Sequence, residues 1–522
     1  MAETARTCEV NGSDVARTGY KVSQPNASPT LDTLFQRTLA RKPEGLALID
    51  PANKPRITGQ PAKRLTYAEA DRAISALAAH FVDSGLPAHS VIAVQLPNTV
   101  EFALTVLAAH RAGLVVALFP LLWRQAELVA ALNRTSARAI VTMAKIDGVV
   151  HSDLAMNAAA EAFSIRHVCG FGSDLPEGMA SLDEALAHPS SSSRPVIQDG
   201  RKAAIISFDV TSDGFRAVPR THLSVIAGAL ALSLESDVQQ GATIMGAFAP
   251  SSFAGLSAAT VTWLLSGGTL VLHHPFDGDV MEEQIIEHSC DTLIAPAPLA
   301  LRLGEFDLAV RMPGLRNIVG LWRAPEQVGS SPSWIAQDVS LTDVYLFGEA
   351  GMFGARRNTE DGTPGRVKLG LHGAPREMPG SSIAGEILLT PKGTLGLRGP
   401  MVAVAAYAPP PAPSDSLITQ PPRDYVDTEY AARLDRATDA IAITAPPSGV
   451  MAVGGYRFLA SDLQEWGRRL GQGALLTALP DRLSGHRLAG RAQDNARARD
   501  ALLELGLNPL MVEAFRDRTT AP

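Results

Sequence analysis

The stretch SFDVTSDGFRAVPRTH, from Ser207 to His222, contains residue types that could grip a phosphate. It follows an apolar run (AAIISF) and precedes an amphipathic run (THLSVIAGALALSL), the place where a phosphate loop leads from a strand into a helix. Yet it contains Asp209 and Asp213, a single glycine, and arginine rather than lysine as its cation. The stretch is therefore a nucleotide loop, an altered one, or an ordinary strand-to-helix loop.

Other chemically capable residues form weaker patterns. His273 and His274 follow an apolar run, but no third metal ligand is evident, which favours histidines at a strand end. The stretch GEAGMFG spaces its glycines by three, so it does not match the dinucleotide fingerprint. Cys8, Cys169 and Cys290 are widely spaced and predict neither a disulfide framework nor a metal quartet.

Length and charge limit the class of protein. A chain of 522 residues predicts two or more domains. A net charge of -7 shows no basic excess, which argues against a nucleic-acid partner. The sparse cysteines fit a reducing compartment. Neither a signal pattern nor an apolar run of membrane-spanning length is visible, so we expect a soluble, cytoplasmic protein.

Apolar strands and amphipathic helices alternate from Leu65 onward. The run TYAEADRAISALAAHFVDSG predicts a helix ending at Gly85, and SVIAVQL, LVVALF and ARAIVTM predict strands separated by helices. A second series contains AAIISF, GTLVLH, DTLIAPAP, NIVGLW and DVYLFGE. Such alternation indicates parallel sheets that helices cover on both faces.

The predicted fold class is α/β, with a large N-terminal domain and a small, shortened α+β C-terminal domain. We expect a disordered tail over residues 1–28 and the N-terminal domain over 29–445. That domain divides into two α/β subdomains, 29–190 and 200–360, and a small β unit, 361–445, with short strands punctuated by glycine. Residues 446–522 form the C-terminal domain.

The order of these segments resembles the adenylate-forming (AMP-binding) superfamily of acyl- and aryl-CoA synthetases. The resemblance rests on LTYAEADRAISALAAHFVDSGL, on VIAVQLPNTVEFALTVLAAHRAGLVVALFPL, and on DTLIAPAPLAL, RGPMVAVAAY and GGYRFLASDLQEW in sequence. It implies joining a carboxylic acid to AMP with MgATP, and then passing the acyl group to a thiol such as CoA or a carrier protein. The substrate does not transfer with the fold.

In this resemblance, SFDVTSDGFRAVPRTH corresponds to the family's TSGTTGxPKGVxxTH phosphate loop. Thr211 and Ser212 take the hydroxyl positions and Arg216 takes the position of the lysine. The three loop glycines fall on Val210, Asp213 and Ala217, and two carboxylates would then face the phosphates. Each such pair of like charges about 5 Å apart costs about 3 kcal/mol at an effective dielectric near 20.

The resemblance also implies the remaining site residues. The family's YGxTE motif falls on YLFGE, which keeps Tyr345 and puts Gly348 at the threonine. The same motif makes Glu349 the catalytic and Mg²⁺-binding carboxylate. The adenine-contacting turn falls on Arg323-Ala324-Pro325, which gives Ala324 and Pro325 as nucleotide contacts. In PSSFAGL, Phe253 takes the place of an acyl-pocket residue.

Three further family features are altered. The ribose aspartate falls on Tyr430, unless Glu429 substitutes after a slip of one residue. The hinge becomes Ala445-Pro446-Pro447-Ser448-Gly449, in which two prolines restrict rotation. The family's catalytic lysine lies near the end of the C-terminal domain, but the last lysine of this chain is Lys392.

Two hypotheses follow. One is a degenerate ligase that has lost ATP chemistry and binds an acyl or aryl acid, a thioester or a partner protein. The other is an active ligase that uses ATP, Mg²⁺ and CoA, with Arg216 and Glu349 compensating for the losses. The altered phosphate loop, ribose position, hinge and lysine favour the first.

Overall fold

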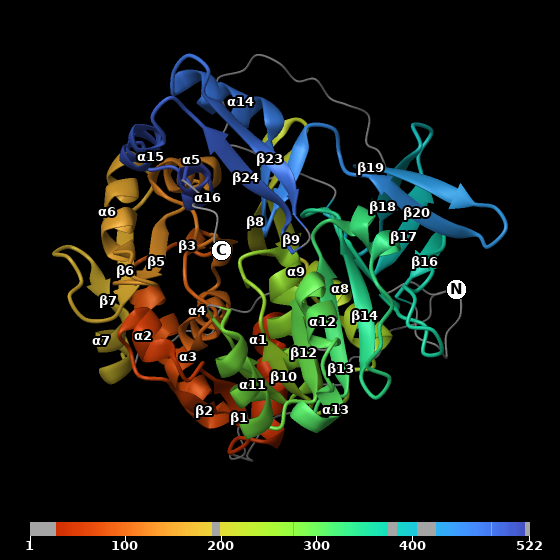
Figure 1. Cartoon of the computed structure of the whole chain (residues 1–522). Helices are drawn as coiled ribbons and strands as arrows, with labels where there is room; N and C mark the ends of the chain where they lie inside the picture. The colour runs from red at the N-terminus through yellow and green to blue at the C-terminus, as the bar shows by residue number, and fades with distance from the viewer. Residues whose placement is uncertain are drawn as a thin grey trace, which may run out of the picture.

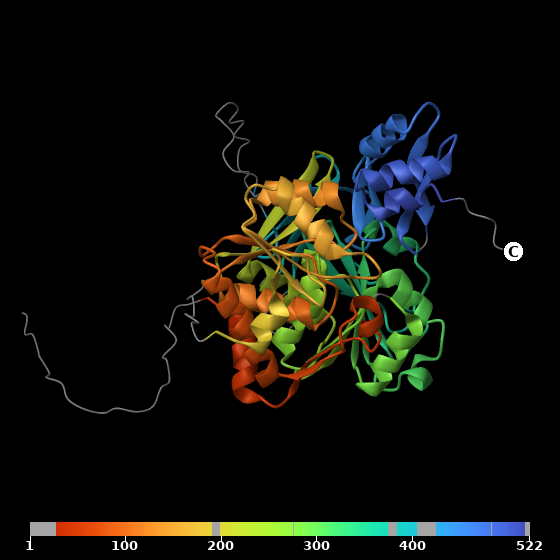
Figure 2. The same cartoon turned by 90° about the vertical axis from the view of Figure 1, so that its left-hand side faces the viewer.

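The computed structural model describes residues 28–190, 199–274, 276–373, 384–403, 424–481 and 483–516. Nearly all of the predicted tail, residues 1–28, lies outside the described residues. So do the tract APPPAPSDSLITQPP and most of PSSSSRP. A large α/β part carries a small C-terminal part on one side (Figure 1; Figure 2). The predicted fold class is confirmed.

The first sheet has the strand order β7-β6-β5-β3-β4-β8-β9. Its strands are β3 (Val91–Val94), β4 (Val115–Leu118), β5 (Ala139–Met143), β6 (His167–Phe171), β7 (Ala180–Ser181), β8 (Ala203–Thr211) and β9 (Gly214–Thr221). All neighbours are parallel except β8 and β9. β4 pairs with β8 only at Ile205 and Ile206, so the rest of β8 extends past the sheet together with β9.

The N-terminal region contributes seven helices among the described residues. They are α1 (Leu31–Arg41), α2 (Lys54–Thr58), α3 (Tyr67–Asp83), α4 (Val100–Arg111), α5 (Gln125–Thr135), α6 (His151–Glu161) and α7 (Leu182–Ala187). The predicted helix before Gly85 is α3, which begins at a capping box of Thr66 and Glu69. α4 is buried along almost its whole length, which explains its continuous apolar sequence.

The second sheet has the order β15-β14-β13-β12-β10-β11-β1-β2. Its strands are β1 (Leu46–Ile49), β2 (Arg64–Thr66), β10 (Thr243–Gly246), β11 (Thr269–Leu272), β12 (Thr292–Pro296), β13 (Asn317–Trp322), β14 (Ser340–Leu346) and β15 (Met352–Arg356). The helical segments of this region are α8 (His222–Glu235), α9 (Phe253–Gly255), the π-helical η1 (Leu256–Val261), α10 (Thr262–Ser266), α11 (Gly278–Glu287), α12 (Ala297–Leu303), α13 (Leu308–Arg311) and the 3-10 segment η2 (Pro325–Ser330).

The two α/β subdomains exchange strands. β1 and β2 lie in the predicted first subdomain, 29–190, but pair within the second sheet. β8 and β9 lie in the predicted second subdomain, 200–360, but pair within the first sheet. The predicted subdomain ranges therefore do not match the sheets. A boundary drawn along the chain cannot represent pairings that long-range hydrogen bonds decide.

The remaining strands form two antiparallel sheets. The sheet of the β unit contains β16 (Gly370–His372), β17 (Gly385–Leu389), β18 (Thr394–Arg398), β19 (Val426–Asp435) and β20 (Ala440–Ala445) in chain order. The C-terminal sheet has the order β22-β21-β24-β23, with β21 (Val450–Val453), β22 (Tyr456–Leu459), β23 (Leu475–Asp481) and β24 (Gly485–Arg491). The helices α14 (Ala460–Arg469), α15 (Asn495–Glu504) and α16 (Pro509–Glu513) belong to the same C-terminal part.

The C-terminal part has an apolar core of its own, which includes Leu463, Leu476, Leu502 and Phe515. Tyr456, at the start of β22, instead packs against the apolar cluster on the α5 side of the first sheet. The two parts therefore meet at β22 and α5. In the part of the chain that the structure describes, no helix is both long and apolar enough to cross a membrane.

Candidate functional site

The segment from Ser207 to His222 is mostly a β-hairpin. β8 and β9 pair from Ala203 and Thr221 up to Thr211 and Gly214, which leaves Ser212 and Asp213 as the turn. The interpretation of this segment as an ordinary strand-to-helix loop is therefore wrong. The residues of FDVT pair with those of GFRA, and Gly214 adopts the positive φ of 104° that follows the turn.

Polar side chains at the tip of the hairpin already have partners. Ser212 Oγ donates a hydrogen bond to Glu429 Oε1 at 2.7 Å. Arg216 forms an ion pair with Asp213, whose side chain is 68% exposed. Asp213 thus points to solvent, and the arginine at the family's lysine position already has a carboxylate partner. Thr211 Oγ1 lies 3.4 Å from the carbonyl oxygen of Gly214.

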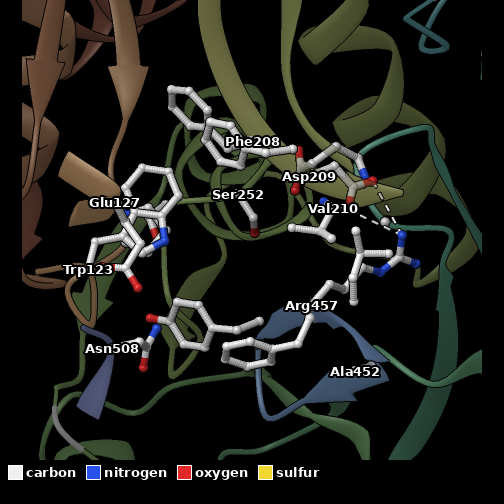
Figure 3. Close-up of a pocket in the computed structure, with 18 of the residues that line it drawn as sticks. Trp123, Glu127, Phe208, Asp209, Val210, Ser252, Ala452, Arg457 and Asn508 are labelled. Carbon is white, nitrogen blue, oxygen red and sulfur yellow. Dashed lines mark hydrogen bonds and ion pairs between the residues drawn. The ribbon is translucent and has the colours of Figure 1, made fainter. Parts of the chain in front are cut away.

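Asp209 points into the protein, and only 9% of its side chain is exposed. Its Oδ2 accepts a hydrogen bond from the backbone N–H of Glu349 at 2.8 Å. Arg457 Nη1 lies 3.2 and 3.3 Å from its two carboxylate oxygens (Figure 3). Arg457 Nη2 donates to the hydroxyl of Tyr430 at 2.7 Å. Arg457 thus joins Asp209, in the segment that aligns with the family's phosphate loop, to Tyr430, which aligns with the ribose position.

The charge of Arg457 is held firmly by this arrangement. Burial opposes the charged form, but the carboxylate of Asp209 and the hydroxyl of Tyr430 raise the pKa of Arg457 above its ordinary value. Burial raises the pKa of Tyr430 to about 12, so the tyrosine is a neutral hydrogen-bond partner at pH 7. The contact is therefore a charge pair extended by one neutral hydroxyl.

Glu349 lies in the turn between β14 and β15 and is also buried. Its Oε2 accepts a hydrogen bond from the backbone N–H of Phe253 at 3.0 Å and lies 3.8 Å from Arg220 Nη1. Burial raises the pKa of Glu349 to about 7, although Arg220 and Ser207 lower it. Burial favours the neutral form of Arg220 as well, and lowers its pKa to about 10. Glu349 is thus one half of a buried ion pair.

The other predicted site residues line the same region less directly. Trp322 and Tyr345 are register partners on β13 and β14, so the Ala324-Pro325 turn and Tyr345 are neighbours. Ala324 is 6% and Tyr345 8% exposed. Phe253 is fully buried, with the Arg220 guanidinium 3.8 Å from its ring centre. Its predicted role in an acyl pocket is not tested by this position.

Two cavities lie on either side of Asp209 and Arg457. The smaller, about 140 Å³, is lined by four of the predicted residues, Thr211, Arg216, Glu349 and Glu429. The larger, about 410 Å³, lies between the N-terminal and C-terminal parts (Figure 3). Of the predicted site residues, only Glu349 lines it. Ser212, Ala324, Pro325, Tyr345 and Phe253 line neither cavity.

The residues present do not fit MgATP. A triphosphate needs unpaired N–H groups and cations. Here the segment is paired as a hairpin, and Arg216 and Arg457 each form an ion pair with a carboxylate. The Mg²⁺ of a bound ATP takes one or two protein carboxylates together with phosphate oxygens, and the carboxylate predicted for it, Glu349, is shared with Arg220. Within the described ranges, no group of three or more His, Cys, Asp or Glu residues could hold a metal ion.

Sequence reasoning missed Arg220 and Arg457. Arg220 lies in VPRTH on the inner face of β9, where a charged residue among apolar neighbours signals a buried partner. Arg457 lies in the GGYRF stretch, directly after the tyrosine that packs on the N-terminal part. Its partner Asp209 is 248 residues away in the chain, so no local pattern could identify the pair.

Comparison with known proteins agrees with this architecture. The family described as AMP-binding enzyme matches residues 35–361. Among curated proteins, the medium-chain fatty-acid–CoA ligase of Escherichia coli is 24% identical over 291 residues, 55% of this chain and 50% of that protein. The salicyl-AMP ligase / salicyl-S-ArCP synthetase of Mycobacterium tuberculosis is 28% identical over 204 residues, 39% of this chain and 35% of that protein. The chain thus spans half or less of the length of these relatives.

Solved structures show the same fold. The amide bond synthetase McbA of Marinactinospora thermotolerans superposes with a TM-score of 0.69 at 15% identity, covering 92% of this chain and 94% of McbA. Apo MbtA of Mycobacterium smegmatis gives a TM-score of 0.65 at 20% identity, covering 91% and 88%. Because the family match extends over more than half of the sequence, this chain belongs to the AMP-binding, adenylate-forming enzyme family.

Proposed function

We propose that this chain is a degenerate member of its family that does not form acyl adenylates and instead binds a small acyl or aryl compound. The observation that carries the proposal is the contact of Arg457 with both Asp209 and Tyr430. By alignment with the family, these two residues stand at a phosphate-loop position and at the ribose position. A nucleotide reaching both positions meets a protein side chain already bound between them.

Displacing Arg457 has an electrostatic cost. It would leave the Asp209 carboxylate, 9% exposed, facing the triphosphate. Like charges about 5 Å apart repel by about 3 kcal/mol at an effective dielectric near 20. Glu349 does not offset this repulsion by binding Mg²⁺. Its carboxylate lies beside Arg220, and its pKa of about 7 leaves it only partly charged near neutral pH.

The larger cavity supports the binding part of the proposal. Its volume of about 410 Å³ lies within the range of about 300–1,000 Å³ that is typical of small-molecule sites. The smaller cavity, about 140 Å³ beside the predicted nucleotide residues, falls below that range. The curated relatives are named for a fatty acid and for salicylate, so an acyl or aryl group is the ligand class we propose. A carrier protein that delivers such a group as a thioester is the corresponding partner.

The test is ATP–pyrophosphate exchange with a panel of medium-chain and aromatic acids, at saturating Mg²⁺ and with the full chain. The proposal predicts exchange at the background level of a protein-free control for every acid. Exchange clearly above background with any acid would show an active ligase that uses ATP, Mg²⁺ and an acyl acceptor. An active family enzyme assayed in parallel verifies that the conditions support the reaction.

A further inference from the structure

The larger cavity has aromatic walls contributed by both parts of the chain. On the N-terminal side lie Trp123, Phe208 and Phe215, with Phe208 and Phe215 stacked at 5.5 Å and Trp123 5.0 Å from Phe208. On the C-terminal side, Tyr456, Phe458 and Trp466 line the same space. Flat apolar walls of this kind favour a planar aromatic or similarly apolar group.

Both guanidinium groups that line the cavity are already engaged. Arg457 is paired with Asp209 and Tyr430. Arg323 donates a hydrogen bond to the carbonyl oxygen of Gly454, and its guanidinium lies 4.0 Å from the centre of the Phe248 ring. A ligand carboxylate entering this cavity would therefore have to compete with existing partners to gain a cation.

Four carboxylates line the cavity, those of Glu127, Asp209, Glu349 and Asp462, against the two guanidinium groups. Asp462 has no guanidinium partner among the described contacts, and Glu127 is attracted only by Arg124, which does not line the cavity. Glu127, in the first turn of α5, accepts a hydrogen bond from the backbone N–H of Arg124 at 3.0 Å. Its other recorded acceptor contacts are with backbone amides, including that of Asn508 in the C-terminal part. Asp462, in the first turn of α14, accepts from Ser461 Oγ at 3.3 Å. The cavity therefore repels a negative charge more than it attracts one.

From this arrangement we infer that the cavity between the two parts selects uncharged apolar ligands, such as an aryl or acyl ester, amide or thioester, over the free carboxylic acid. The inference rests on the proposed function, in which no adenylation step needs a free carboxylate. Because Trp123 and Trp466 lie on opposite walls, a ligand between them contacts both parts of the chain. Its binding should therefore stabilise their docking and raise the unfolding temperature.

Three probes of nearly equal shape test the inference: 2-naphthamide, 2-naphthoate and 2-naphthylmethylammonium, titrated into the full chain at pH 8 by calorimetry and tryptophan fluorescence. The amide is expected to bind at least about tenfold more tightly than the carboxylate. The ammonium compound measures how far the lining prefers a positive charge. Equal or tighter binding of naphthoate would overturn the inference, and so would the absence of amide binding.

Two variants with matched controls locate the effect. Glu127→Gln keeps an acceptor for the capping box, so it should increase naphthoate affinity relative to amide affinity, whereas Asp213→Asn, outside the cavity lining, should leave that ratio unchanged. Ala130→Trp, which fills the cavity from α5, should abolish amide binding, while Asn133→Trp on the same helix should not. Amide binding that survives Ala130→Trp would contradict this location.

The outcome for this inference is separable from that for the proposed function. If naphthoate binds as tightly as naphthamide while ATP–pyrophosphate exchange stays at background, the inferred ligand class is overturned and the proposed function is not. Exchange above background would overturn the proposed function whatever the probes show.

Discussion

The two sides of Asp209 and Arg457 differ in what they leave free. On the hairpin side, Ser212 is bonded to Glu429, Arg216 to Asp213, and a cavity of only about 140 Å³ remains. On the α5 side, aromatic walls enclose about 410 Å³. The residues that align with the family's nucleotide loop make internal polar contacts, whereas a cavity remains where the two parts meet. Buried polar groups need hydrogen-bond partners, whereas the walls of an apolar cavity do not.

The largest effect is expected from breaking the buried ion pair of Arg220 and Glu349. Arg220→Met leaves the Glu349 carboxylate without its guanidinium partner, and removing one member of a buried pair costs about 3–5 kcal/mol. Urea unfolding at pH 8 measures the change in the free energy of unfolding. Arg216→Met, which breaks only the exposed pair at the hairpin tip, is the control and should cost less than about 1 kcal/mol. Equal losses would mean that Arg220 is not specially coupled to Glu349.

A second effect is a pH dependence that belongs to Glu349. Its pKa is raised from 4.5 to about 7, so the folded state binds its proton more tightly than the unfolded state. The stability that protonated Glu349 contributes is therefore full below pH 4.5 and is lost as the pH rises to about 7.

Comparison with Glu349→Gln isolates this contribution from groups that titrate in the same range. Burial lowers the pKa of His110 to about 4 and of His222 to about 2, so these histidines give the opposite trend, but they are present in both proteins. The free energy of unfolding of the wild type, relative to Glu349→Gln, should fall between pH 4.5 and 7. A constant difference would contradict the raised pKa.

A smaller effect is expected from separating Arg457 from its partners. Arg457→Met leaves the Asp209 carboxylate without its guanidinium, which costs about 3 kcal/mol, the lower end for a broken buried pair, because Asp209 keeps the hydrogen bond from the backbone N–H of Glu349. Asp209→Asn in the same chain should recover part of the loss, because the uncompensated charge is removed. A double-mutant cycle in urea measures the coupling between the two residues. Additive losses would show that the pair contributes nothing beyond its separate members.

The smallest effect is expected at the hairpin tip. Asp213→Gly restores one glycine of the family's loop, but Asp213 is exposed and lies in the turn, so the free energy of unfolding should change by no more than about 0.5 kcal/mol. Exchange of pyrophosphate into ATP should stay at background. Recovered exchange would mean that the rest of the nucleotide site is sound and that the contrast between the two sides is mistaken.

The fold was largely predictable from the sequence, because strands such as VIAV and helices such as α3 carry strong periodicity and a capping box. The alternation of FDVT and FRAV around Ser-Asp-Gly fits a hairpin, but the resemblance to the family implies a phosphate loop at this place. The strand exchange of β1–β2 and β8–β9 depends on long-range pairing. The contacts of Arg220 and Arg457 join residues 129 and 248 positions apart, beyond any local pattern.

The most direct test of the central claim is binding of MgATP to the full-length chain, measured by calorimetry and by the shift in unfolding temperature. The Arg457–Asp209–Tyr430 contact predicts no detectable heat and no shift at millimolar MgATP. Arg457→Met should bind no better, because Asp209 then faces the phosphates. Saturable binding of MgATP with a matching rise in the unfolding temperature would show that the nucleotide site is intact.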